Sequence, residues 1–344
     1  MAYRAAVVGG SGYTGAELLR LLAGHPDLDV VHVTADSNAG ARVATLYPSL
    51  AAAYPDLVYG PMDPAAVAGL DVVFLAMPHG ASQGFAPGIV DTVAHVVDLG
   101  ADFRLPPEGY ARWYGESHTA PALIDRFGYG MVELYRDEIT QHAHAAVPGC
   151  YPTAASLALA PLFAAGLVEP DVIVDAMSGL SGAGRGLKVS SHFSEADENV
   201  VAYGLLTHRH TAEIEQALTK VGGAPVTALF TPHLVPMVRG MNATCHAHPA
   251  VEGLSTAKLL EVYRDFYAGE PFVVVADEPP PTKAATGANT CHVTVRYDER
   301  TGRVLALGVL DNLAKGASGG AVQNANLLLG LPETLGLPTV GMWP

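Results

Sequence analysis

Residues 3–22 read YRAAVVGGSGYTGAELLRLL. The apolar residues 3–8 are typical of a buried strand, and the apolar run at 16–22 is typical of a helix that packs on a sheet. Gly10, Gly12 and Gly15 match the dinucleotide-binding fingerprint, in which small residues permit a tight turn and close approach of a pyrophosphate; a purely structural turn is the alternative. The segment predicts an α/β fold with a Rossmann-type domain. The cofactor contacts expected in this turn are Gly10, Ser11, Gly12, Tyr13, Thr14 and Gly15.

A second predicted strand, residues 30–35, ends at Asp36, where the adenosine ribose lies in folds of this type. Asp36 is suited to accept hydrogen bonds from both ribose hydroxyls, which favours NAD. Ser37, Asn38 and Arg42 are suited to hold a 2′-phosphate, which favours NADP. The position of these residues leaves both cofactors open.

Two further strands are predicted at 71–77 and from residue 96 onward. The first ends at Pro78 and His79, in a loop at the carboxyl end of a strand, where such folds bind cofactor and substrate. The second ends near Arg104, a candidate anion contact, for which a surface ion pair with Asp102 is the alternative interpretation.

Cys150 stands in the motif VPGCYPT (147–153), directly before the apolar run 154–160, so we expect a helix to start at the cysteine. The N–H groups and the positive dipole end of a helix lower the pKa of a thiol placed there. Cys150 is therefore a candidate nucleophile for attack on a carbonyl carbon. The alternative is a small buried side chain, the usual fate of a free cysteine.

A predicted strand at 172–176 leads into the glycine- and serine-rich stretch SGLSGAGRG (178–186), with Lys188 behind it. Its N–H and hydroxyl donors suit recognition of a carboxylate or phosphate, whereas a flexible linker is the alternative. The candidate substrate contacts here are Ser178, Ser181 and Arg185, and Gly182 is a candidate cofactor contact.

His208 and His210 flank Arg209 just before a predicted helix, with Thr211 or a neighbour as its cap and Glu213 in its first turn. If this segment is extended, both rings project the same way. A catalytic thiolate needs an acid–base partner with a pKa near 7, which histidine supplies. We expect no metal site, because no third ligand has suitable spacing.

Strands predicted at 226–230, 241–247, 272–275 and 292–297, with a helix at 256–266, indicate an α+β domain whose sheet is mostly antiparallel. Arg239, before the second of these strands, is a further candidate substrate contact. A small-residue turn at 311–320 then opens an apolar helix, where we expect the chain to return to the first domain. The predicted division is 1–149 with 312–344 as the cofactor domain, and 150–311 as the substrate and oligomerisation domain. The candidate cofactor contacts in the late turn are Asn312, Lys315 and Gly316.

The length of 344 residues suits two domains that each bury a core. A formal net charge of −15 disfavours a nucleic-acid or acidic-membrane binder, because phosphate contacts need clustered Lys and Arg. Three widely spaced cysteines disfavour a disulfide framework or zinc site, and no long apolar segment is present. We therefore expect a soluble protein of the reducing cytoplasm.

Six motifs together resemble those of the N-acetyl-gamma-glutamyl-phosphate reductase family, within the wider aspartate-semialdehyde dehydrogenase group, and the likeness runs end to end. They are GGSGYTG (9–15), ADFRL (101–105), PGCYPT (148–153), SGLSGAGR (178–185), HRHT (208–211) and NLAKG (312–316). The resemblance implies Cys150 as nucleophile, His210 as the acid–base residue, His208 beside the substrate and Arg104 near the phosphate. It also implies NADPH as reductant, although Asp36 departs from what a 2′-phosphate pocket needs.

The implied activity is reduction of N-acetyl-glutamyl 5-phosphate to N-acetyl-glutamate 5-semialdehyde and inorganic phosphate, in arginine biosynthesis, by a homo-oligomer, either a dimer or a tetramer. A sister reductase that acts on a blocked aminoadipyl phosphate in lysine biosynthesis is the nearest alternative, and a longer substrate pocket would distinguish it. Aspartate-semialdehyde dehydrogenase itself fits the motifs around Arg104 and Cys150 less well. A non-catalytic NADP-sensing protein is an alternative of another class. Cys150 and His210 argue against it, because such a protein would not need them.

Overall fold

The computed structural model describes residues 2–343 and divides into two compact units. Of the described residues, the first unit comprises 2–148 and 317–337, and the second comprises 149–316 and 338–343. The predicted division differs from this one at Gly149, at 312–316 and at 338–343, which group with the second unit.

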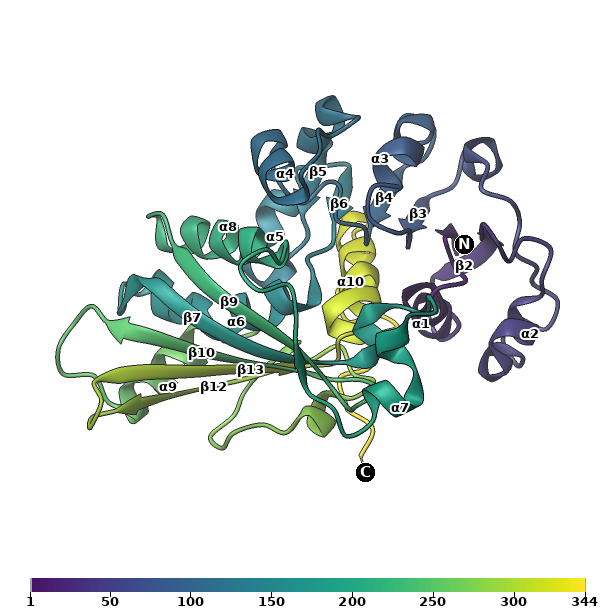
Figure 1. Ribbon diagram of the computed structural model, residues 1–344. Coiled ribbons are helices and arrows are strands. Elements are labelled where there is room, and N and C mark those ends of the chain that lie inside the picture. Colours follow the sequence, from purple (N-terminus) through teal and green to yellow (C-terminus); the bar gives the residue numbers. More distant parts are fainter. Residues whose placement is uncertain (1, 344) are drawn as a thin grey trace. The chain divides into compact units, whose positions relative to one another are not determined.

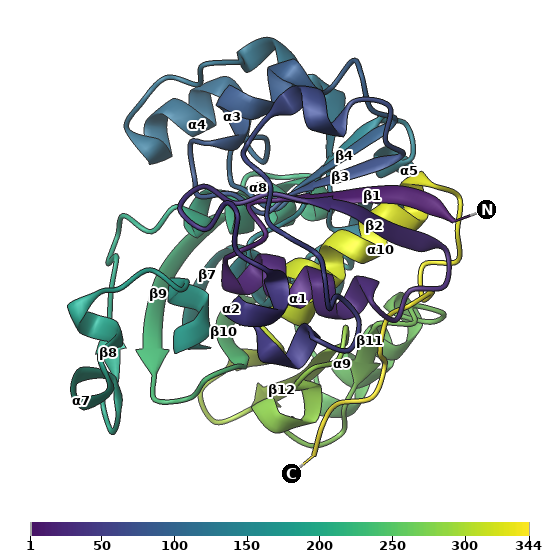
Figure 2. The same ribbon diagram turned by 90° about the vertical axis from the view of Figure 1, so that its right-hand side faces the viewer.

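The first unit is built on a six-stranded sheet in the order β2-β1-β3-β4-β6-β5, in which every neighbouring pair is parallel. The strands are β1 (Tyr3–Val8), β2 (Leu28–Val33), β3 (Val72–Leu75), β4 (His95–Asp98), β5 (Phe127–Tyr129) and β6 (His144–Ala146). Helices α1 (Tyr13–Leu22) and α10 (Gly319–Leu328) lie on one side of this sheet and α3 (Ser82–Phe85) on the other (Figure 2). The predicted Rossmann-type fold is confirmed.

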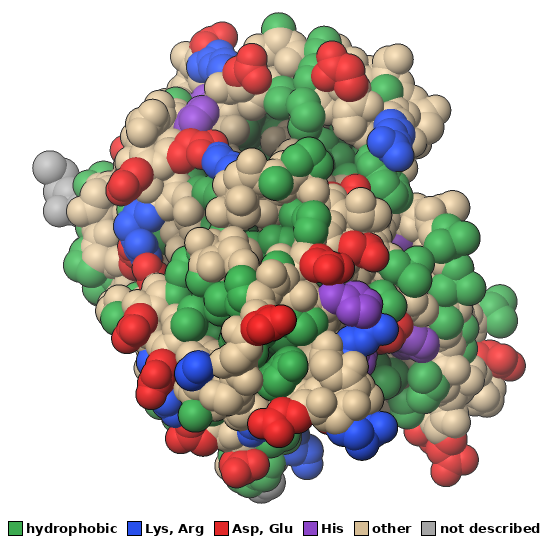
Figure 3. Space-filling view, turned by 90° about the vertical axis from the view of Figure 1, so that its left-hand side faces the viewer, with side chains coloured by type: hydrophobic (Ala, Val, Ile, Leu, Met, Phe, Trp, Pro, Cys, Tyr) green, Lys and Arg blue, Asp and Glu red, His purple; other side chains and the backbone are tan. Residues whose placement is uncertain are grey.

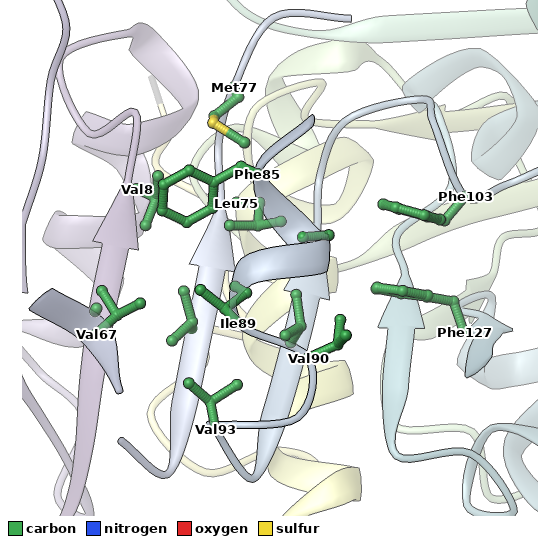
Figure 4. Close-up of a cluster of buried hydrophobic side chains, with 14 of the residues drawn as sticks. Val8, Val67, Leu75, Met77, Phe85, Ile89, Val90, Val93, Phe103 and Phe127 are labelled. Atoms are coloured by element: carbon green, nitrogen blue, oxygen red, sulfur yellow. The ribbon is translucent and has the colours of Figure 1, made fainter. Parts of the chain in front are cut away.

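A buried apolar cluster fixes the carboxyl ends of β3 and β4, where the candidate cofactor loops begin. Leu75 and Met77 contribute to it from β3 and the residues that follow, and Phe85 packs on them from α3 (Figure 4). Phe103 stacks on Phe127 with ring centroids 4.2 Å apart and an interplanar angle of 7°. The loops after both strands are therefore held by packing at the point where they leave the sheet.

The second unit contains a seven-stranded sheet in the order β11-β12-β13-β10-β7-β9-β8. Its pairs are antiparallel except β7 with β9 and β11 with β12, so the predicted mostly antiparallel sheet is confirmed. The strands are β7 (Val168–Gly179), β8 (Val201–Ala202), β9 (Thr227–Val235), β10 (Met241–Pro249), β11 (Val273–Val275), β12 (Cys291–Asp298) and β13 (Arg303–Leu310).

Helix α6 (Cys150–Ala164) is the central helix of the second unit, and its residues 151–163 are all buried. It packs on β10, β12 and β13, while α8 (His210–Gly222) packs on α6 and β9 and α9 (Thr256–Phe266) packs on β12 (Figure 1). A Cβ at Gly308 of β13 would lie 2.2 Å from the Ala154 carbonyl oxygen, so only glycine lets the helix backbone approach this strand so closely. The remaining helices are α2 (Val43–Leu46), α4 (Pro107–Tyr114), α5 (Val132–Ile139) and α7 (Phe193–Ala196).

Several apolar side chains of the seven-stranded sheet are exposed. Burial alternates along β7 and β9, and Ile173, Met177 and Leu229 are 38%, 48% and 47% exposed.

In Figure 3, Lys and Arg side chains lie scattered among Asp and Glu on the face shown. No helix within residues 2–343 combines the length and apolar character needed to span a bilayer.

His144 gives the first unit a pH-dependent stability. Its side chain is buried in β6, and burial, with Arg126 and His95 nearby, lowers its pKa from 6.5 to about 4. As the pH falls from 6.5 towards 4, the unfolded chain binds a proton there that the folded chain does not, so this residue removes up to about 3 kcal/mol of stability. Urea midpoints of the His144→Gln variant should therefore fall less steeply over this range than those of the wild type. Equal slopes would contradict the prediction.

Candidate active site

Cys150 is the first residue of α6, as predicted, and Gly149 is its N-cap. The first turn of this 15-residue helix itself contains no acidic side chain; the carboxylate at its N-cap, that of Glu213, comes from α8. Pro152 is tolerated in this turn because the first N–H groups of a helix have no acceptor within it. Cys150 is only partly buried, whereas the other two cysteines are buried.

Gly316 lies directly against Cys150. A Cβ on Gly316 would be 2.7 Å from the Cys150 Cβ, so a larger residue would displace Cys150 or the helix start. Gly316 belongs to a single π-helical turn, Ala314–Ser318, which follows β13. In the same turn Lys315 is buried, with its Nζ 5.5 Å from the centre of the Phe272 ring.

His210 packs against the residue that precedes Cys150. A Cβ on Gly149 would lie 2.4 Å from the His210 Nε2, so the absence of a side chain at 149 makes room for the imidazole ring. The Gly149 backbone is otherwise ordinary, with φ −66° and ψ 155°. The structure thus brings His210 to the start of α6.

Glu213 joins the starts of α6 and α8 and was not predicted as a site residue. Its fully buried carboxylate accepts a 3.0 Å hydrogen bond from the Gly149 N–H, and its Oε1 lies 3.9 Å from the His210 Nε2. His210 and Glu213 are three residues apart on α8 and so share a helix face. This spacing was the signal in the sequence that could have identified Glu213.

His208 is neutral at physiological pH. Burial, with a smaller effect of the Arg209 charge, lowers its pKa to about 4. Its Nδ1 accepts a 3.2 Å hydrogen bond from the His210 backbone N–H. The segment is not extended, since Arg209 has α-helical angles (φ −61°, ψ −26°) and α8 begins at His210. The two imidazole rings nevertheless meet edge to face, 4.8 Å apart, because His208 folds back onto the helix start.

Two tyrosines beside the histidines were also missed. The Tyr151 ring contacts both His208 and His210, at centroid distances of 5.6 and 5.8 Å. The Tyr151 hydroxyl donates to the His233 carbonyl and accepts from the Tyr203 hydroxyl. Burial raises the pKa of Tyr203 to about 12, so its hydroxyl stays protonated at neutral pH. Tyr151 follows Cys150 in the predicted motif, but nothing in the sequence indicates its contact with residues near 208.

The candidate anion-binding residues in the stretch 178–188 include buried serines and exposed residues. Ser178 and Ser181 are buried, and the Asn312 Nδ2 donates a 2.9 Å hydrogen bond to the Ser181 hydroxyl. Ser178 is the last residue but one of β7, which is longer than predicted, and Ser181 lies in the 3₁₀ turn Leu180–Ala183. The remaining candidates of this stretch, Gly182, Arg185 and Lys188, are exposed.

Arg239 lies in the connection between β9 and β10. Its Nε is 2.8 Å from the Asp311 Oδ2, and 19% of its side chain is exposed. Asn312 accepts a 2.8 Å hydrogen bond from the N–H of the neighbouring Gly240. Arg239 and Asn312 are both predicted site residues, and the fold brings them close together although they are far apart in sequence.

The glycine turn of the first unit fits a dinucleotide. A Cβ on Gly10 would meet Val33 at 2.5 Å, and one on Gly15 would meet the Gly10 backbone at 2.5 Å, so both are needed for the turn itself. Space next to Gly12 is open, with no atom within 4 Å of a Cβ placed there. The first turn of α1 has no acidic residue, which leaves the helix N-terminus suited to phosphate. Tyr13 and Thr14 belong to this first turn.

Only some of the residues predicted to contact the adenosine part of the cofactor lie next to the glycine turn. The Asn38 side chain is 3.3 Å from the Ser11 hydroxyl and 3.4 Å from the Ser37 hydroxyl, so these three side chains adjoin the glycine turn. Asp36 is exposed. Arg42 is also exposed and lies 3.7 Å from Asp56.

The loops after β3 and β4 are held together by Asp102. This fully buried carboxylate accepts hydrogen bonds from the Gly80 and Gln83 N–H groups, and its Oδ1 lies 3.1 Å from the His79 Nδ1. Pro78, just before His79, is exposed. Arg104 is buried, as Asp102 is, and donates to the Leu99 carbonyl oxygen, so neither residue lies on the surface. Among the described residues, no group of three or more His, Cys, Asp or Glu side chains is arranged to hold a metal ion.

Two family models match the chain. The semialdehyde dehydrogenase NAD-binding domain matches residues 4–142, and the semialdehyde dehydrogenase dimerisation domain matches residues 150–312. An N-acetyl-gamma-glutamyl-phosphate reductase from Symbiobacterium thermophilum is 49% identical and covers 99% of both chains. One from Pseudomonas aeruginosa is 48% identical and covers 98% of both.

Solved structures agree with the fold. Aspartate semialdehyde dehydrogenase II from Vibrio cholerae has a TM-score of 0.72 at 16% identity and covers 96% of this chain and 99% of its own. Aspartate semialdehyde dehydrogenase from Candida albicans, solved with NADP, has a TM-score of 0.70 at 15% identity and covers 97% of this chain and all of its own. Together with the family model, these matches indicate a nicotinamide dinucleotide as cofactor.

Substitution of Gly149 tests the packing of His210. In Gly149→Ala the new methyl group would occupy the position of the imidazole ring, so His210 must move away from the start of α6. We expect alkylation of Cys150 by iodoacetamide to slow about tenfold or more, because displacing a reacting group by about 1 Å costs up to about 10²-fold. Gly84→Ala, where a Cβ meets nothing within 4 Å, is the matched control. An unchanged alkylation rate would show that His210 does not influence the thiol.

Proposed function

We infer that this chain, which belongs to the N-acetyl-gamma-glutamyl-phosphate reductases within the semialdehyde dehydrogenases, reduces N-acetyl-glutamyl 5-phosphate to N-acetyl-glutamate 5-semialdehyde with release of phosphate. The reaction belongs to arginine biosynthesis. The observation that carries the inference is Cys150 at the start of a buried helix, with His210 packed on the adjacent Gly149. A thiol at such a position beside an imidazole suits covalent capture of an acyl group.

In the first half of the reaction Cys150 attacks the acyl carbon as a thiolate. The new C–S bond forms while the bond from that carbon to the phosphate oxygen breaks, and phosphate leaves with both electrons of that bond. The product is a thioester on Cys150. N–H groups in the first turn of α6 are proposed to stabilise negative charge on the acyl oxygen.

In the second half the thioester becomes an aldehyde. Bound NADPH supplies the hydride. His210 is proposed to take the proton from the Cys150 thiol before attack and to return a proton as the thiohemiacetal collapses and frees the thiol. Glu213, buried between the Gly149 N–H and the imidazole, orients His210 and stabilises its protonated form.

The substrate anions are proposed to be held by donors of the second unit and by Arg104. Ser178, Ser181 and Arg239 are fixed by surrounding hydrogen bonds and an ion pair. Arg185 is exposed and is proposed to reach the substrate from the loop after β7. The role of Arg104 near the phosphate follows from likeness to the family rather than from a contact in the structure.

The cofactor is proposed to be NADP(H) rather than NAD(H). Its pyrophosphate would lie over Gly12 at the start of α1, where the space is open. Ser37, Asn38 and Arg42 would face the 2′-phosphate, and the contact of Asn38 with Ser11 supports this placement. The proposed contacts on the nicotinamide side are Pro78, His79, Gly182, Asn312, Lys315 and Gly316.

The chain is proposed to work as a homo-oligomer in the cytoplasm. The exposed apolar side chains of β7 and β9, including Ile173, Met177 and Leu229, form a face suited to pairing with a second copy. The matching dimerisation domain model supports this proposal. All three cysteines are free thiols, which suits a reducing compartment.

The first test of the function is phosphate-dependent reduction of NADP, compared with NAD, in the reverse direction. N-acetyl-glutamate 5-semialdehyde and its homologue with one more carbon are offered separately. Activity with the shorter aldehyde, only when phosphate is present, is the expected result. Preference for the longer aldehyde would indicate the lysine route, and no activity with either would favour a sensor without catalysis.

The covalent step is tested by Cys150→Ser. We expect turnover to fall by about 10³-fold or more, because removal of a nucleophile leaves only binding and oxyanion stabilisation. Equilibrium binding of NADP, measured by calorimetry, should stay within about twofold of the wild type, because the glycine turn is untouched. Substantial turnover by the variant would exclude a thioester intermediate.

Substitution of His210 should slow turnover much more than substitution of His208. Asparagine at 208 can still accept the hydrogen bond from the residue 210 N–H, so we expect His208→Asn to slow turnover less than about tenfold. His210→Asn removes the proposed acid–base group and should cost about 10²-fold or more. Turnover numbers of the two variants, measured side by side, give the comparison, and the opposite order would exchange the two roles.

A further inference from the structure

We propose that Asp311 is a positioning residue, which holds the guanidinium of Arg239 in the orientation that binds an anionic group of the substrate. This proposal rests on the proposed function, because it concerns how the acyl phosphate is bound. Asp311 is not one of the predicted site residues, and its carboxylate is fully buried directly after β13. A buried carboxylate of this kind must be compensated by close partners.

Four groups surround the Asp311 carboxylate. Its Oδ1 accepts hydrogen bonds from the Leu313 and Ala314 N–H groups, at 2.9 and 3.1 Å. Its Oδ2 accepts from the Gly287 N–H at 2.7 Å and lies 2.8 Å from the Arg239 Nε. Three of the partners are backbone groups, so the direction of the carboxylate is fixed by the fold. The guanidinium is the one side-chain partner among these four.

This geometry leaves Arg239 able to meet a ligand. The ion pair joins the Arg239 Nε to the Asp311 Oδ2, while 19% of the side chain stays exposed. A guanidinium recognises phosphate or carboxylate best when two N–H groups point at two oxygens in a fixed plane. The Asp311 carboxylate, held by three backbone N–H groups, restricts the guanidinium to one orientation. Without this partner the long arginine side chain would sample many rotamers.

Asn312, the residue after Asp311, holds the backbone beside Arg239. Asn312 accepts from the Gly240 N–H at 2.8 Å and donates to the Ser181 hydroxyl at 2.9 Å. The Gly316 N–H donates to the Asp311 carbonyl oxygen at 3.0 Å, in the turn that packs on Cys150. One dipeptide, Asp311–Asn312, thus connects Arg239, the Ser181 turn and the turn against the nucleophile. Loss of the Asp311 charge should disturb anion binding first, because the Asn312 contacts remain.

The kinetic test compares Asp311→Asn, Arg239→Gln and the double variant in the reverse assay. We expect Asp311→Asn to raise the KM for phosphate about 10- to 100-fold, with the KM for NADP within about twofold, because a buried charge pair contributes this much to binding. The double variant should be no worse than Arg239→Gln alone, because both changes disable one group. Asp277→Asn, which removes the exposed partner of Arg264, is the matched control and should change neither constant.

Two kinetic outcomes would overturn the proposal. In one, the effects of the two single substitutions multiply in the double variant. In the other, Asp311→Asn leaves the KM for phosphate unchanged and lowers kcat, NADP affinity and thermal stability together, as a general structural role would. If Asp311→Asn does not fold, Asp311→Glu keeps the charge but displaces the carboxylate. It must then raise the KM for phosphate at an unchanged KM for NADP, and failure to do so overturns the proposal.

A binding measurement separates this proposal from the proposed function. Inorganic phosphate is titrated into protein labelled with ¹⁵N-arginine, and the Arg239 Nε–H resonance is assigned from Arg239→Lys. We expect phosphate to shift this resonance in the wild type, with half-saturation at least about tenfold higher in Asp311→Asn. Equal half-saturation, or no phosphate-induced shift in the wild type, overturns the positioning role. Absence of phosphate-dependent turnover with an intact shift would instead count against the reaction alone.

Discussion

The hydrogen bond from the Gly149 N–H to the buried Glu213 carboxylate is the interaction on which the arrangement of the active site depends. It ties the N-cap of α6 to the first turn of α8, and so holds the helix start at Cys150 next to the segment that carries His210. A carboxylate at the N-terminus of two helices is stabilised by both dipoles. The missing side chain at Gly149 then lets the His210 ring occupy the space above the helix start.

Much of the fold could be predicted because its signals are local. The glycine turn, the helix start at Cys150 and the helix Thr256–Phe266 each follow from neighbouring residues, and the structure has them as expected. Strands β5 and β6 were missed because each has only three residues and, unlike the equally short β11, no run of β-branched residues. Strand β7 begins before its predicted start, in a polar stretch whose pairing with β10 and β9 decides its conformation.

The site could be predicted only where chemistry and spacing coincide in one short segment. Cys150 and His210 were proposed in this way. The spacing of Glu213 from His210 was a usable signal, but its contact with Gly149 spans 64 residues, and the contact of Arg239 with Asp311 spans 72. No single-sequence pattern reveals such distant contacts, since a buried carboxylate looks like a solvated one until the fold surrounds it.

The close approach of α6 to β13 at Gly308 limits how this scaffold can diversify. The helix backbone meets the strand with no side chain between them, and residues 151–163 are buried, so the start of the helix cannot slide along the strand. If Cys150 acts as proposed, acyl chains of other lengths would have to be accommodated by the exposed stretch after β7 and by the connection that carries Arg239. The position of Cys150 is thus fixed by the scaffold, and the range of substrates would depend on these loops.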